Sequence, residues 1–268
     1  MTGTGVQSDP YIPTTLTEFI NAVGTAGAYV ALTQDINAAD DPEYSGELTS
    51  EIAINAANVE GAGHTVSGVT FNAVYGFTLA SGSYVYDLTL RDIAGKATVA
   101  GAFFVGSGSS NCGLRGCKAA IKLDGGTQYI AYDTGFFECA LDVTCTSDVN
   151  STIFSGCGFY KTTIAISGAS LAYSSAINIS TFSRSAIIFY APKRAGYAVF
   201  NYNSSLTYSY VCIADPVTGT VAIGSPSMTL SIVATTDGQA LSAPSSAILA
   251  TIDQMKDKDW LTSVGFLP

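Results

Sequence analysis

The sequence has little positive charge, a single histidine, a single tryptophan and no long apolar run. Its 268 residues include 11 Lys and Arg against 21 Asp and Glu, which gives a net charge of −10. This balance lacks the basic footprint of nucleic-acid-binding proteins, so we expect no nucleic-acid partner. No apolar run approaches the roughly 20 residues that span a membrane, so we expect no membrane partner either.

A secretion signal is also missing from the N-terminal segment. The opening MTGTGVQSDPYIPTT has neither a basic stretch nor an apolar core. We therefore expect synthesis in a reducing cytosol, where disulfides are uncommon.

The residues that are abundant favour short strands joined by tight turns. Hydrophobic residues make up 47% of the chain and charged residues only 12%, a composition too apolar for a disordered protein. The 27 Gly, 15 Tyr and 13 Phe accompany many Ser and Thr, whereas helix-forming Glu and Lys are scarce. Such a composition predicts an all-β fold.

A repeat of roughly 20–24 residues, within the range typical of solenoids, runs through the middle of the chain. Apolar stretches end at Leu123, Val143, Ile166 and Phe189, and the intervals between them are nearly equal. No helical pattern lies between them, so each unit consists of strands and turns. A period of this kind predicts a solenoid in which each turn covers its neighbours and buries an inner row of side chains.

The six cysteines fit this solenoid best as reduced thiols facing the lumen. Cys117 and Cys139 are separated by one such interval and fall at equivalent positions of neighbouring units. Free cysteine packs as a small hydrophobic residue. Stacked cysteines can also approach closely enough for a disulfide, and a zinc site is the remaining alternative. The paired short spacings typical of zinc ligands are missing, so we expect no metal.

Short helices are expected at both ends of the solenoid. Residues 15–24 have the apolar spacing of a helix, and Thr15 and Glu18 have capping-box spacing. Ile248, Leu249, Ile252 and Met255 predict a second helix that covers the C-terminal end. We therefore divide the chain into an N-terminal attachment arm (1–13), an N-terminal cap (14–50), a parallel β-helix (51–215), and C-terminal strands with a capping helix (216–268).

Residues 59–71, VEGAGHTVSGVTF, resemble a stretch found in the early coils of right-handed parallel β-helix proteins, the pectate-lyase-like solenoids. Gly61, Gly63, His64 and Val66 match that stretch, and Ala62 replaces its usual Asn. The resemblance covers about residues 50–215. It implies a single right-handed parallel β-helix and says almost nothing about function.

The two ends of the chain resemble those of β-helix proteins encoded in phage structural-gene clusters. The opening segment with DPYIPTTLTEFINAVGTAGAYV and the closing WLTSVGFLP are similar to ends of head fibres, capsid decoration proteins and tail-fibre components. This resemblance implies a virion protein assembled in the cytoplasm of a bacterial host, and a homo-oligomer, usually a trimer. It offers no catalytic residue and no cofactor to carry over.

Enzymes of this fold need clustered carboxylates, with or without calcium and a basic residue. Asp133, Glu138 and Asp142 are close in sequence, but turn and surface roles are more typical of them. Arg184 is the one cation inside a coil-like stretch with an outward position. His64 has Glu60 four residues away, although a histidine in this turn more often binds its own loop. We expect no enzymatic activity.

The expected function is therefore a structural rod that is attached through its N-terminal arm. Pro10, Tyr11 and Pro13 are the predicted partner-binding residues of the arm, because proline lowers the entropy lost on docking. Trp260 either anchors a neighbouring subunit or packs on its own chain. Tyrosines of residues 197–210 either stack on glycans or form cross-strand ladders. The alternative function is a tail fibre or tailspike that binds or degrades surface polysaccharide.

Overall fold

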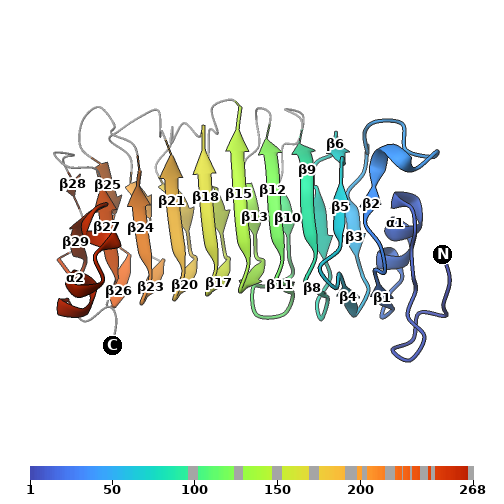
Figure 1. The fold of residues 1–268 in the computed structure, drawn as a ribbon, viewed down its shortest axis with the longest axis horizontal. Coiled ribbons are helices and arrows are strands. Elements are labelled where there is room, and N and C mark those ends of the chain that lie inside the picture. The colour runs from blue at the N-terminus through green and yellow to red at the C-terminus, as the bar shows by residue number, and fades with distance from the viewer. Residues whose placement is uncertain are drawn as a thin grey trace.

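A computed structural model shows a parallel β-helix, which confirms the predicted all-β fold (Figure 1). The structure describes residues 1–95, 102–123, 129–146, 153–168, 175–190, 198–200, 204–214, 221–224, 226–229, 231–235, 241–242 and 245–264. Each coil contributes one strand to each of three sheets, which we call sheets I, II and III in the order in which the chain visits them. Neighbouring strands within a sheet run parallel.

The strands of each sheet follow one another along the rod. Sheet I contains β3 (Ile52–Ile54), β7 (Phe77–Leu79), β10 (Ala102–Val105), β13 (Tyr129–Tyr132), β16 (Phe154–Ser155), β19 (Ser175–Asn178), β22 (Ala198–Phe200), β25 (Val221–Gly224) and β28 (Leu241–Ser242). Sheet II contains β1 (Tyr29–Ala31), β4 (Asn58–Glu60), β8 (Tyr84–Tyr86), β11 (Gly113–Arg115), β14 (Gly135–Phe137), β17 (Gly158–Tyr160), β20 (Thr181–Ser183), β23 (Ser205–Thr207) and β26 (Ser227–Thr229).

Sheet III is the largest and forms the front of the molecule in Figure 1. It contains β2 (Ile36–Asn37), β5 (Thr65–Ser67), β9 (Thr89–Gly95), β12 (Lys118–Leu123), β15 (Ala140–Cys145), β18 (Thr163–Ser167), β21 (Ala186–Tyr190), β24 (Tyr210–Ile213), β27 (Ile232–Thr235) and β29 (Ile248–Thr251), with β6 (Thr70–Phe71) paired to β9. The 3-10 turn η1 (Ala38–Asp40) directly follows β2.

The coil length explains the sequence repeat. Gly135, Gly158, Thr181 and Ser205 lie in register on successive strands of sheet II, so the interval between neighbours is one coil. The earlier coils are longer, because the intervals from Asn58 to Tyr84 and from Tyr84 to Gly113 exceed those of the central coils. The repeat is therefore clearest in the central coils, where the sequence predicted it.

Apolar side chains fill the lumen of the coil. The inner positions of sheet II include Phe136, Phe159 and Phe182, whose rings stack with centroid distances of 5.2 Å and 4.5 Å. All three side chains are buried. In-register stacking repeats the same contact from coil to coil, so the core extends along the rod instead of gathering at one centre.

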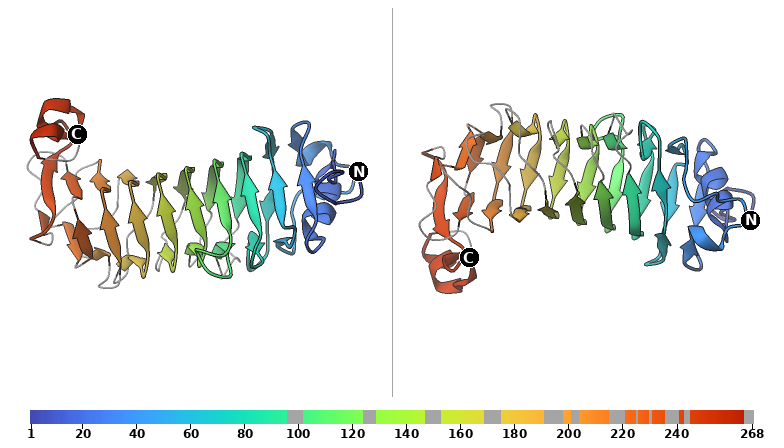
Figure 2. Two further views of the ribbon diagram at one scale, coloured as in Figure 1. Left: turned by 90° about the horizontal axis from the view of Figure 1, so that it is seen from below. Right: turned by 90° about the horizontal axis from the view of Figure 1, so that it is seen from above.

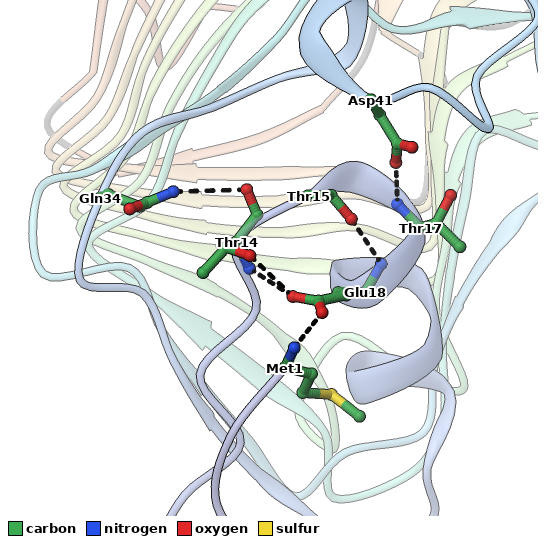
Figure 3. Close-up of polar contacts among 7 residues, drawn as sticks. All are labelled: Met1, Thr14, Thr15, Thr17, Glu18, Gln34 and Asp41. Carbon is green, nitrogen blue, oxygen red and sulfur yellow. Dashed lines mark hydrogen bonds and ion pairs between the residues drawn. The ribbon is translucent and has the colours of Figure 1, made fainter.

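The predicted N-terminal helix is present as α1 (Leu16–Gly24). The Thr15 side chain accepts from the backbone N–H of Glu18, as the capping-box spacing predicts. The Glu18 carboxylate, however, accepts from the backbone and hydroxyl of Thr14 and from the terminal amino group of Met1 (Figure 3). Because Leu16, Phe19 and Val23 are buried in the core, α1 covers the first coil.

The segment predicted as an attachment arm folds back on the first coil. Thr2 and Ile12 form an antiparallel bridge, and Tyr11 forms a parallel bridge with Val30 of β1. Tyr11 thus adds to the otherwise open edge of sheet II, and exposed edges of this kind favour unwanted pairing with other chains. Gly5 has φ +79°, and a Cβ there would lie 2.5 Å from the Tyr11 ring, so glycine permits this packing.

The C-terminal helix differs from the prediction. Residues 248–251 form strand β29, which pairs in register with β27, and the helices that follow are the 3-10 turn η2 (Gln254–Lys256) and α2 (Lys258–Ser263). The apolar residues at 248 and 249 were compatible with either period, and pairing with the preceding coil decides for the strand. Trp260 packs with Ile232, Ala234 and Ala250 on the outer face of sheet III.

Helix α2 therefore stands beside the rod at its C-terminal end, as Figure 2 shows. Ile232 and Ala234 occupy outward positions of β27, and the residues of α2 that pack on them shield these apolar side chains from water. The helix stabilises the side of the last coils, and does not lie across the lumen as the prediction assumed.

Candidate functional site

The sharp turn between sheets II and III, which we call the II–III corner, places one exposed residue per coil in the left-handed conformation. The residues in this row are Asp87, Gly116, Glu138, Lys161, Arg184 and Tyr208, with φ between 46° and 65°. Residues other than Gly, Asn and Asp rarely adopt this backbone conformation. The later coils nevertheless carry a carboxylate, two cations and a tyrosine there.

A row of small polar residues anchors the II–III corner from inside. Thr162, Ser185, Ser209 and Ser231 each follow a corner and are buried. The hydroxyl oxygens of Ser185 and Ser209 accept from the backbone N–H groups of Thr162 and Ser185, at 3.1 Å each. Each hydroxyl also donates to a carbonyl two residues earlier. This polar ladder satisfies the turn's backbone and fixes the corner residues above it.

Cys117 and Cys139 occupy the same row in the preceding coils. Both are buried thiols, as the sequence predicted, and each Sγ donates to a carbonyl two residues earlier at 3.4 Å and 3.3 Å. A second row at the turn between sheets I and II contains Cys112, Thr134, Cys157, Ser180 and Ser204. These four cysteines therefore lie where other coils have Ser or Thr. All six are free, and only Cys212 is half-exposed, on the outer face of β24.

A groove of about 690 Å³ lies outside the II–III corner over three successive coils. Lys161, Arg184 and Tyr208 line it from the corner, and Tyr210 lines it from the first outward position of β24. Small side chains at Thr163 and Ala186 form its floor. Since neighbouring strands are about 4.8 Å apart, Lys161, Arg184 and Tyr208 follow one another along the rod, and Tyr210 lies on the same coil as Tyr208.

The two cations of this groove differ in their partners. Lys161 Nζ donates to Glu138 Oε1 at 2.8 Å. This hydrogen bond raises the pKa of Lys161 and lowers the pKa of Glu138. No hydrogen bond or ion pair joins the Arg184 side chain to another described residue. Within the described part of the chain, the donors of Arg184 are therefore available to a ligand.

The outer face of sheet III continues the groove toward the N-terminus. Two shallower hollows of about 370 Å³ each lie over β9, β12 and β15. They share Ala120 and Asp142, and one of them shares Thr163 with the groove at the corner. The outward positions of this face include several alanines, whose short side chains leave shallow depressions between the larger residues.

Cations of the protein gather beside these hollows. Six of the eight described Lys and Arg residues lie on sheet III, at the II–III corner or, for Arg115, at the end of β11 next to that corner: Arg91, Arg115, Lys118, Lys122, Lys161 and Arg184. Arg115 lies 4.9 Å and 4.4 Å from the ring centroids of Tyr84 and Phe137. Tyr84 and Phe137 thus hold the Arg115 side chain against its own surface by cation–π contacts.

The predicted acidic residues do not form one cluster. Asp133 and Glu138 lie at opposite ends of β14, roughly 15 Å apart along an extended chain. Burial raises the pKa of Asp133, whereas Glu138 is paired with Lys161. Asp142 points outward from β15, as predicted, and lines the two shallower hollows.

His64 lies beside a carboxylate that the sequence analysis did not consider. Its Nδ1 is 3.4 Å from Asp35 Oδ1, and Asp35 also accepts from the backbone N–H of Thr65. Glu60 instead accepts from the backbone N–H of Ala62. Ala62 stands where this turn usually has Asn, and its φ is 51°. The His64 side chain thus contacts a neighbouring turn of its own chain.

The four predicted partner-binding residues all contact their own chain to some degree. Pro13 is buried, Pro10 and Tyr11 are half-buried in the N-terminal hairpin, and Trp260 is half-buried against sheet III. Of the tyrosines predicted in residues 197–210, Tyr208 and Tyr210 line the groove. Tyr197 and Tyr202 lie outside the described residues.

No protein-family model matches the chain, and no curated protein matches its sequence. In the part of the chain that the structure describes, no helix is long and apolar enough to cross a bilayer. The same residues contain no group of three or more His, Cys, Asp and Glu side chains placed to hold a metal ion. The groove is therefore interpreted from its own geometry.

Arg184 and the tyrosine segment stand out in the sequence, but the groove that joins them does not. A signal was present, because Lys161, Arg184 and Tyr208 follow one another at the interval of the coil. Aligning the residue two positions before each sheet III strand would have placed them in one row.

Proposed function

We propose that the protein is a non-enzymatic structural component of a bacteriophage virion, a β-helical head fibre or capsid decoration protein attached through its N-terminal end. The observation that carries the attachment is the distribution of charge along the rod. Residues 1–90 contain ten Asp and Glu and neither Lys nor Arg, so the remaining 11 acidic and 11 basic residues cancel. The whole net charge of −10 thus belongs to the N-terminal part.

Such a rod suits attachment by one end. The acidic cap, with α1 and the docked hairpin, offers a surface for a basic patch on a partner, because complementary charge steers encounter and fixes orientation. The neutral remainder, with its continuous apolar lumen, extends away from that partner as a stiff body. The virion assignment itself rests on the resemblance of the chain's ends to those of phage β-helix proteins, and so does a homotrimeric state.

Electron microscopy of particles tests the proposal. Particles from a phage that lacks the gene are expected to lack a projection, and adding the purified protein is expected to restore it. Mass spectrometry of purified particles is expected to detect the chain. If complete, washed particles do not contain the chain, the proposal is wrong. Light scattering of the purified protein checks the trimer separately.

The alternative is a tail fibre or tailspike that binds or degrades surface polysaccharide. The hollows along sheet III favour binding, and Asp142 within them is the acidic residue to test for cleavage. New reducing ends or unsaturated products from bacterial polysaccharide, lost in Asp142→Asn but retained in Asp133→Asn, would establish an enzyme at this face. We expect no products.

A further inference from the structure

We propose that the groove at the II–III corner binds an anionic oligosaccharide in which one acidic sugar is flanked by a neutral sugar. Arg184 would bind the carboxylate of the acidic sugar, and Tyr208 and Tyr210 would stack on its neighbour. This inference concerns the groove alone and does not depend on where the protein is located.

The charges around the groove select a single anionic group. Arg184 has no hydrogen bond or ion pair with another described residue, and its planar guanidinium matches the two oxygens of a carboxylate. Lys161, on the preceding coil, contributes positive charge, but it is hydrogen-bonded to Glu138. A second anionic group at the position beyond Lys161 would meet the Glu138 carboxylate and be repelled.

The tyrosines select the neighbouring ring. Tyr208 is 44% exposed at the corner, and Tyr210 is half-buried beside it. An aromatic ring offers an apolar face to the C–H groups of a sugar and a hydroxyl for a hydrogen bond. Because the coils follow one another at about 4.8 Å, successive sugars would contact successive coils. A sugar chain lying along the rod would thus present its carboxylate to Arg184 and its neutral ring to the tyrosines.

The backbone conformation of these residues is the one shared by the row of residues at the II–III corner. Arg184 and Tyr208 have φ of 51° and 48°, a conformation in which glycine is free of strain. A glycine in either position would suit the turn better than the residue present. The same geometry supplies the test, because replacement by glycine removes the side chain without harming the turn.

Calorimetric titration of the full chain with defined oligosaccharides tests the proposal. The probes are hyaluronan oligosaccharides, in which carboxylate-bearing and neutral sugars alternate, oligogalacturonate, in which every sugar is charged, and neutral maltooligosaccharides. We expect hyaluronan oligosaccharides to bind at least tenfold more tightly than either of the others. We also expect Arg184→Gly and Tyr208→Gly each to weaken that binding at least tenfold, and added salt to weaken it in the wild type.

Ile179→Gly is the matched control. Ile179 has φ 47° at the opposite corner of the same coil as Arg184, so its replacement has the same backbone effect outside the groove. Binding is expected to be unchanged in this variant, and circular dichroism and melting temperature check the fold of all three. Undetectable binding at millimolar concentration, equal binding of the neutral probe, or full binding by Arg184→Gly would overturn the proposal. Equal binding of polyglutamate would overturn the choice of a saccharide.

Discussion

At the scale of single residues, burial lowers the reactivity of the cysteine thiols. Desolvation raises the pKa of the Cys145 thiol to about 11 and that of Cys157 to about 12. Interaction with the neighbouring Cys139 thiol, together with burial, raises the pKa of Cys117. Since the thiolate is the reactive form, these side chains resist modification while the protein is folded.

This predicts a specific titration with a thiol reagent. In the native protein at neutral pH only Cys212 is expected to react within minutes, because it is half-exposed on the outer face. In denaturant all six cysteines are expected to react. A denatured count below six would reveal a disulfide, and Cys212→Ser serves as the control that should abolish the native reaction.

The left-handed corner residues make a second prediction at this scale. Arg184→Gly should raise the unfolding free energy by about 0.5–1 kcal/mol, because relief of the backbone strain exceeds the entropy cost of glycine. Arg115→Gly is the matched control, since Arg115 lies in strand β11 and contacts two aromatic rings, and it should lower stability. Chemical denaturation measures both. A lower stability for Arg184→Gly would contradict this account of the corner.

At the scale of elements, the buried polar ladder holds sheets II and III at a fixed angle. Ser185→Ala should destabilise the protein by about 1–3 kcal/mol, because the backbone N–H of Thr162 loses its acceptor inside the core. Ser185→Cys should cost less, since cysteine already occupies this row at two positions. Ser205→Ala, at an outward position of β23, is the neutral control, and equal melting temperatures for all three variants would refute the ladder's role.

The N-terminal hairpin is an element whose docking should depend on pH. The terminal amino group and Thr14 lower the pKa of Glu18 from 4.5 to about 2. A carboxyl with a lowered folded-state pKa stabilises the fold above its unfolded pKa, and this stabilisation is lost as pH falls from about 4.5 toward 2. The hydrogen-exchange protection factors of residues 2–12, which correct for the intrinsic pH dependence of amide exchange, should therefore fall through that range.

Glu18→Gln provides the control for the hairpin. This variant should show lower protection factors already at neutral pH, and they should lose most of their pH dependence. If wild type and variant respond identically to acid, another group controls the docking.

At the scale of the whole molecule, sequence reasoning succeeded where one coil predicts the next. The spacing of Leu123, Val143 and Ile166 and the equivalence of Cys117 and Cys139 were sufficient for the solenoid and its inner thiols. It failed at the ends, where no neighbouring repeat constrains the interpretation. Ile248 and Leu249 suit a helix or a strand equally, and only pairing with β27 decides between them.

The groove was missed for a related reason. Its side chains come from three coils, and each is an ordinary surface residue within its own coil. The N-terminal hairpin was missed because its bridges join residues such as Tyr11 and Val30, which no local pattern relates.

The uneven charge of the rod leads to a last prediction about attachment. If the acidic residues 1–90 dock on a basic partner surface, attachment to particles should weaken steeply as ionic strength rises, since exposed charges are screened beyond about 10 Å at 0.1 M salt. Neutralising exposed acids of the cap, as in Asp40→Asn with Glu43→Gln, should lower the association rate and flatten this salt dependence. Asp253→Asn with Asp259→Asn removes the same charge at the opposite end and should leave both quantities unchanged. Equal effects of the two pairs would show that net charge alone, and not a polarised rod, governs attachment.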